Sequence, residues 1–112
     1  MAIAEAFSGT EAVSTTEHSM TTDTAGPDTD TTDGVYQIWL DLSDMVTGDE
    51  LQIRVYETII SSGIIVFQAN LVGAQSPPIW VSPTLVLGTG WDATLDAIAG
   101  TITVNWSIRQ VT

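Results

Sequence analysis

Few residues in this 112-residue chain have the chemistry for catalysis. Nucleophilic catalysis needs a nucleophile, a base and a group that orients the base. The single histidine, His18, lies in a polar, threonine-rich stretch, where we expect a surface position. Asp92 and Asp96 share one face of a predicted strand and could act as an acid and a base, but carboxylates on a wet face usually serve only solubility. We therefore expect no catalytic residues and no enzyme.

A second candidate is the stretch Asp28-Thr-Asp-Thr-Thr-Asp-Gly34, whose oxygen ligands have the close spacing that calcium prefers. If Asp28 is the first ligand of a calcium loop, Asp33 occupies the sixth position, where glycine belongs. The twelfth position is then Trp39 instead of a bidentate glutamate. We favour a solvated Asp/Thr turn over an irregular calcium site, and we expect no metal and no other cofactor.

Four tryptophans could form the stacking platform of a carbohydrate-binding module. Trp91 and Trp106 lie on apolar strand faces, which predicts that they belong to the core. Trp39 lies on a mixed face and Trp80 follows a break at Pro77-Pro78, so these two are candidates for a subunit interface or a ligand surface. A glycan site would need Trp39 and Trp80 to be exposed and coplanar on one face.

Charge restricts the partners, because 14 acidic residues stand against two basic ones, for a net charge of −12. Nucleic acid and anionic membranes are excluded, since phosphate contacts need Lys or Arg, and a neutral or basic protein surface is expected instead. No stretch approaches the roughly 18 apolar residues of a membrane span, and the first residues do not resemble a signal peptide. The absence of cysteine excludes a disulfide framework. We expect a soluble protein made in the cytoplasm.

Residues 1–34 form a polar, acidic, threonine-rich N-terminal arm. Threonine favours extended structure, so a strand is predicted over about residues 11–22, with a turn following it; a disordered leader is the alternative. The arm has too few apolar side chains to order itself. We expect it to pair as an edge strand and to contact another chain, with Val13, Thr15 and Met20 as candidate interface residues together with Trp39 and Trp80.

From residue 35 to 112, apolar residues recur with the period of two that is typical of strands. Strands are predicted over 35–42, over a hairpin at 51–71 that turns at Ser61-Ser62-Gly63, over 80–87, and over a final hairpin around Gly100. The predicted core consists of the residues on the apolar faces: Leu51, Ile53, Val55, Phe67, Trp91, Leu95, Ile102, Val104, Trp106 and Ile108.

Seven or eight short strands with frequent turn signals predict an all-β fold, a single-domain antiparallel β-sandwich of the jelly-roll or immunoglobulin-like kind. The arm would lie at its edge and residues 35–112 would form its core. Soluble sheets often protect their edges with lysine, and this chain has none. Either carboxylates and Pro83 protect the edges or neighbouring copies occupy them, and the second interpretation favours a homo-oligomer within an assembly.

Several stretches, spread nearly end to end, resemble a family of small proteins from tailed-phage and environmental viral genomes. They are Val13-Ser-Thr-Thr-Glu17, Thr31-Thr-Asp-Gly-Val-Tyr-Gln37, Gly73-Ala-Gln-Ser76 with Pro78, Trp80-Val-Ser-Pro83, Gly90-Trp-Asp-Ala-Thr-Leu95, Ile98-Ala-Gly-Thr101 and Trp106-Ser-Ile-Arg109. The resemblance implies a virion structural protein, either a capsid decoration or cement protein that binds the major capsid protein, or a neck, tail or head-fibre component. It implies no catalytic residues. A carbohydrate-binding module is the alternative from another class.

Overall fold

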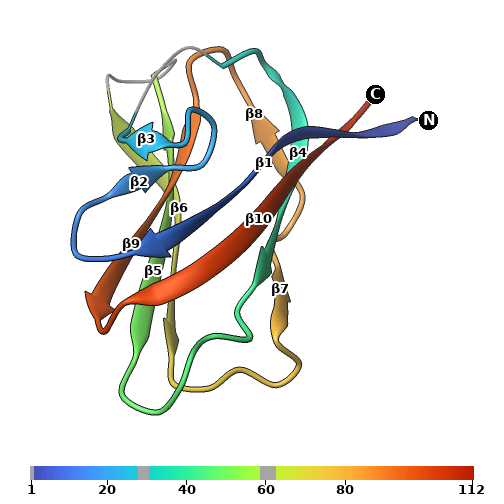
Figure 1. The fold of residues 1–112 in the computed structure, drawn as a ribbon. Coiled ribbons are helices and arrows are strands. Elements are labelled where there is room, and N and C mark those ends of the chain that lie inside the picture. The colour runs from blue at the N-terminus through green and yellow to red at the C-terminus, as the bar shows by residue number, and fades with distance from the viewer. Residues whose placement is uncertain (1, 28–30, 59–62) are drawn as a thin grey trace.

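The computed structural model describes residues 2–27, 31–58 and 63–112. Two antiparallel sheets, A and B, lie face to face and enclose the core (Figure 1). The described residues contain ten strands and no helix, so the predicted all-β sandwich is confirmed. The number of strands exceeds the seven or eight expected, because four of the ten are only two or three residues long.

Sheet A has three long strands side by side, with two short strands sharing the outer edge of the third. In spatial order the strands are β1 (Ile3–Val13), β10 (Ile102–Val111), β4 (Gly34–Asp41), and then β7 (Ile79–Val81) and β8 (Leu85–Leu87). The strand predicted over residues 80–87 is therefore two strands. The break follows from Pro83, which has no N–H to donate to the sheet.

Sheet B has the spatial order β3 (Thr24–Ala25), β2 (His18–Ser19), β9 (Asp92–Ala99), β5 (Glu50–Glu57) and β6 (Ile64–Val72). The hairpin of β5 and β6 is confirmed, although the Ser61-Ser62 part of its predicted turn lies outside the described residues. The prediction of a final hairpin around Gly100 is wrong. Gly100, with a φ of 84°, carries the chain from β9 in sheet B to β10 in sheet A, so these two strands face each other across the core.

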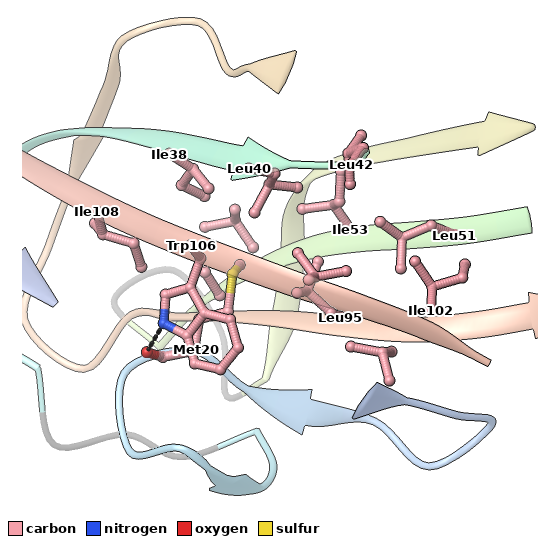
Figure 2. Close-up of a cluster of buried hydrophobic side chains, with 14 of the residues drawn as sticks. Met20, Ile38, Leu40, Leu42, Leu51, Ile53, Leu95, Ile102, Trp106 and Ile108 are labelled. Carbon is pink, nitrogen blue, oxygen red and sulfur yellow. Dashed lines mark hydrogen bonds between the residues drawn. The ribbon is translucent and has the colours of Figure 1, made fainter. Parts of the chain in front are cut away.

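The predicted core is confirmed, with Phe67 half-buried at its margin and the other nine residues buried (Figure 2). The inward residues of β4 and β10 meet those of β5 and β9, as period-two alternation requires. Trp106 extends across this core, and its indole Nε1 donates a hydrogen bond to the Met20 carbonyl at 2.9 Å. Gly9, opposite it on β1, makes room for the ring, because a Cβ there would lie 2.5 Å from the Trp106 Cζ2.

The N-terminal arm enters the fold differently from the prediction. Its long strand is β1, at the edge of sheet A, and not a strand over residues 11–22. The chain leaves β1 at Ser14, whose carbonyl accepts a hydrogen bond from Ala97 N, and crosses to sheet B. Val13 and Met20 are each only 1% exposed and lie in the core. Their expected interface role is therefore wrong, because the monomer already buries them.

Candidate functional site

The outer face of sheet A carries aromatic, apolar and charged side chains together. Along β4, Ile38 and Leu40 point into the core, so Gln37, Trp39 and Asp41 point outward. The β10 residues opposite them also point outward, because antiparallel partners share a face. This face is defined here by the outward residues of β1, β10, β4, β7 and β8.

At the centre of this face the Arg109 guanidinium stacks on the Trp39 ring, 4.0 Å from its centroid. The Trp39 indole Nε1 donates to Gln37 Oε1 at 3.2 Å, which fixes the ring on the sheet. Arg109 is one of the two basic residues, and the other, Arg54, lies 3.6 Å from Glu17. Among the described residues, no carboxylate forms an ion pair with Arg109, whose half-buried side chain lies over an aromatic surface.

A shallow pocket of about 200 Å³ adjoins this stack. Trp39 and Ile79 supply its apolar wall, while Asp41, Asn105 and Ser107 supply polar atoms. Hydrogen bonds from the side chain and the backbone N–H of Ser43 hold the pKa of Asp41 below its ordinary value. The pocket therefore combines an aromatic wall with a fixed negative charge and a nearby positive one.

Exposed apolar side chains follow the β7 and β8 edge of the same face, and one of them, Ile79, lines the pocket. Val81 lies opposite Trp39, and Ile79 lies opposite Asp41. Val86, which is 80% exposed, lies opposite Val35 on β4. Such a cluster of exposed apolar residues beside a Trp–Arg stack is typical of a binding surface rather than of a solvated sheet face.

The same face carries little charge. Its charged residues are Glu5, Asp41 and Arg109, for a net charge of −1, whereas the whole chain has −12. Glu5 accepts a hydrogen bond from Ser107 Oγ at 2.5 Å, which places it beside the central stack. A protein partner therefore meets less electrostatic opposition here than the net charge alone suggests.

Two more of the predicted interface residues, Thr15 and Trp80, lie away from the outer face of sheet A. Thr15 is exposed in the connection between β1 and β2. Trp80 points inward from β7, where its ring centroid lies 6.3 Å from that of Phe67 and closes one side of the sandwich. Trp39 and Trp80 thus lie on opposite faces of sheet A, and the two-tryptophan glycan platform that the sequence left open does not form.

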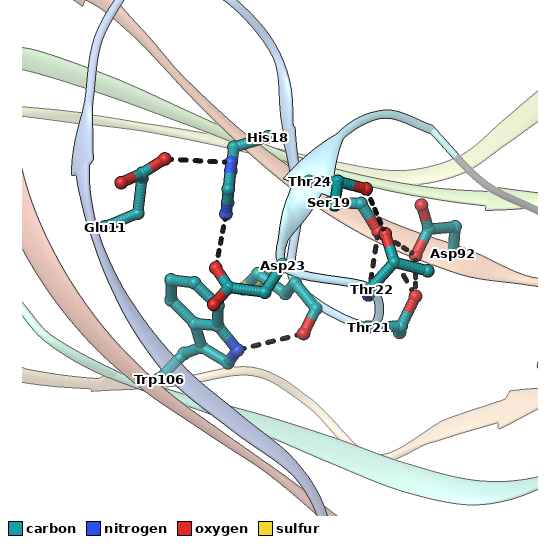
Figure 3. Close-up of polar contacts among 10 residues, drawn as sticks. Glu11, His18, Ser19, Thr21, Thr22, Asp23, Thr24, Asp92 and Trp106 are labelled. Atoms are coloured by element: carbon teal, nitrogen blue, oxygen red, sulfur yellow. Dashed lines mark hydrogen bonds and ion pairs between the residues drawn. The ribbon is translucent and has the colours of Figure 1, made fainter.

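His18 is not the surface residue that we expected (Figure 3). Its side chain is buried against Trp106, with ring centroids 5.6 Å apart. His18 Nδ1 lies 3.2 Å from Glu11 Oε2, and its Nε2 lies 2.7 Å from Asp23 Oδ1. His18 therefore links β1, β2 and the turn that follows β2, which is a structural role. The sequence offers no signal for this role, because all three partners are nonlocal or lie in a turn.

Asp92 is also misplaced by the prediction, which put it on a wet strand face. It is 0% exposed and accepts hydrogen bonds from Ser19 Oγ at 3.0 Å and Thr21 Oγ1 at 2.5 Å (Figure 3). The reason is that β9 is an interior strand of sheet B, and the segment after β1 pairs beside it as β2, which brings the hydroxyl groups of Ser19 and Thr21 to the carboxylate. The carboxylate therefore anchors the crossing segment.

A polar cluster on sheet B consists of Glu17, Arg54, Tyr56, Thr94 and Asp96. Glu17 Oε2 accepts hydrogen bonds from Tyr56 Oη at 2.6 Å and from Thr94 Oγ1 at 2.5 Å. Asp96 lies near Arg54, yet its Oδ1 is buried without a hydrogen-bond partner. Burial raises the pKa of Asp96, and the Arg54 charge only partly opposes this.

No group of three metal-ligating side chains occurs among the described residues. Glu11 and Asp23 contact opposite nitrogens of the His18 ring, so they cannot share one cation with it. Asp28 and Asp30 of the calcium-like stretch lie outside the described residues. Thr31 and Thr32 contact the core: Thr31 Oγ1 donates to the Trp91 carbonyl, and Trp91 Nε1 donates to the Thr32 carbonyl at 2.9 Å.

In the part of the chain that the structure describes, no helix is long and apolar enough to cross a membrane. No protein-family model matches the sequence, and a search of curated proteins finds no relative.

Proposed function

We propose that the protein is a non-enzymatic structural component of a tailed-phage particle, most simply a capsid decoration protein, and that it docks through the outer face of sheet A. The particle is suggested by the sequence stretches that resemble small viral proteins. The docking face is suggested by one observation above all, the stack of Arg109 on Trp39 at 4.0 Å within a weakly charged, partly apolar sheet face.

Tryptophan and arginine are the residues that most often dominate the binding energy of protein interfaces. Here both are held in place before any partner arrives, because Gln37 fixes the indole and Ser107 accepts a hydrogen bond from Arg109 Nε at 3.4 Å. A preorganised pair loses little side-chain entropy on binding. Ile79 and Val81 beside it would exclude water from the contact.

The chemistry of this face also describes its partner. An apolar patch would cover Trp39 and its neighbours, and a carboxylate or carbonyl oxygen would approach Arg109. In the proposed particle this surface belongs to the major capsid protein. A neck, tail or head-fibre protein with the same surface chemistry is the alternative within the structural class.

The test is cosedimentation with particles assembled from the major capsid protein encoded in the same genome. Wild-type protein should sediment with the particles, and Trp39→Ala should bind about thirtyfold more weakly, the effect of losing a binding hot spot. Ile98→Ala is the matched control, because it removes an apolar side chain that is 47% exposed on sheet B. This variant should bind like the wild type.

Equal binding by Trp39→Ala and the wild type would remove the docking face from the proposal. Wild-type protein that stays in the supernatant at saturating particle concentration would contradict capsid decoration. A parallel glycan array completes the comparison, since tight glycan binding lost in Trp39→Ala would assign the pocket to a carbohydrate instead.

A further inference from the structure

The open edge of sheet B has an unusual composition for this protein. It is formed by β6, whose nine residues Ile64–Val72 include no charged residue and no proline. β6 pairs with β5 on one side, and no described strand pairs with its other side. Natural sheets usually protect such an edge with charge, proline or a bulge. Only the last device is present, as one extra residue at Val66.

The inward side chains of β6 are incompletely covered. Phe67, Ala69 and Leu71 lie opposite Val55, Ile53 and Leu51 of β5 and pack against the core, yet they stay half-buried. Val66 and Val72, near the two ends of the strand, are 43% and 67% exposed. A further strand at this edge would cover apolar surface on β6 as well as satisfy its free backbone groups.

Charge indicates which strand fits. A chain with a net charge of −12 repels its own copies over most of its surface. The other long edge strand, β1, carries Glu5 and Glu11 and would bring carboxylates together. At the β6 edge, two copies can meet without bringing carboxylates together. A strongly charged partner would find no side chain of opposite charge on β6. We propose that β6 pairs antiparallel with β6 of a second copy, which joins the two B sheets into one.

The regular part of β6 selects a register. Beyond the extra residue at Val66, a two-fold axis at Ala69 places Phe67 opposite Leu71 of the second copy and Gln68 opposite Asn70. Inward residues then meet inward residues, which an isologous antiparallel pair requires. At the ends of the paired stretch, Val66 faces Val72 of the second copy, so apolar contacts border it on both sides.

Analytical ultracentrifugation over a range of concentrations tests this pairing. The wild type should show a concentration-dependent dimer. The double variant Val66→Lys with Val72→Lys places like charges opposite each other at both ends, and its dimer dissociation constant should rise about tenfold or more. Val66→Lys with Val72→Glu makes the same apolar losses but restores opposite charges, so it should stay within a few-fold of the wild type.

A wild type that is monomeric throughout, or a lysine pair that dimerises as well as the wild type, would overturn the proposal. If both double variants lose the dimer equally, the axis at Ala69 is wrong. Far-UV circular dichroism checks that each variant is folded. As a second measurement, Ala69→Cys should form a disulfide-linked dimer on mild oxidation, because paired Cα atoms lie about 4.5–5.5 Å apart. The chain has no cysteine of its own, and Thr47→Cys in an exposed turn is the control.

Discussion

At the scale of single residues, the polar contacts in the interior hold the crossing segment between β1 and β3. His18, Ser19 and Asp92 are buried, and each contacts residues of this segment or of a strand beside it. Trp106 contributes both a large apolar surface and a hydrogen bond to the Met20 carbonyl. These residues explain how an acidic, threonine-rich stretch becomes ordered.

Trp106→Ala should lower the free energy of unfolding by about 3–5 kcal/mol, because it leaves a cavity and removes the donor to the Met20 carbonyl. Urea unfolding followed by circular dichroism measures this loss. Thr103→Ala, an exposed change on the same strand, should be nearly neutral. A loss below about 1 kcal/mol for Trp106→Ala would mean that the indole is not part of the core.

Asp96→Asn tests the polar cluster on sheet B. Because burial raises the pKa of Asp96 in the fold, the protonated form is favoured there. The stability contributed by this group is present below its unfolded pKa and is lost as the pH rises through its folded pKa. Thermal melts of the wild type and the variant should therefore diverge in favour of Asp96→Asn between acid and neutral pH. A difference that is constant with pH would contradict the raised pKa.

At the scale of elements, β1 is the strand whose removal is most informative. It pairs with β10 along nearly its whole length and supplies the buried Val13. Deleting residues 1–13 should lower the free energy of unfolding by several kcal/mol, because the burial of Val13 and of Phe7 contributes at most about 1.5–3 kcal/mol each. It also leaves a long edge of β10 unpaired. We expect a lower melting temperature and aggregation by light scattering, whereas a chain starting at Ile3 should behave like the wild type.

The crossing segment links this element to the second sheet. Once β1 is fixed, Ser14 starts the passage to sheet B, where Glu17 and His18 find their partners. A deletion that retains residues 14–112 and unfolds as cooperatively as the wild type, at the same denaturant midpoint, would show that β1 is dispensable.

At the scale of the whole molecule, charge is distributed unevenly over the two sheets. The outer face of sheet A carries a net charge of −1, so most of the acidic residues lie elsewhere. This asymmetry leaves one face suited to a protein partner. The β6 edge, which is uncharged, belongs to sheet B. The two proposed contacts therefore use separate surfaces.

The intact protein should not depend on a divalent cation. Its calcium-like stretch lacks the register of a strong site, and the described residues hold no group of three metal-ligating side chains. EDTA should change the melting temperature by no more than about one degree, and added calcium should not raise it. A fall of several degrees in EDTA, reversed by calcium, would show that a metal site exists.

From residue 35 onward, the alternation of apolar residues located most of the long strands and the side of each that faces inward, whereas the strand of the N-terminal arm was predicted at the wrong residues. Ile53, Leu95 and Ile108 were predicted in the core from alternation alone, because the side-chain direction along a strand is a local property. Pairing is not local. Only the tertiary structure placed β9 and β10 in different sheets, turned Trp39 and Trp80 to opposite faces, and buried His18 and Asp92. Period two identifies the apolar face of a strand, but it does not say which strand lies beside it or what covers its polar face.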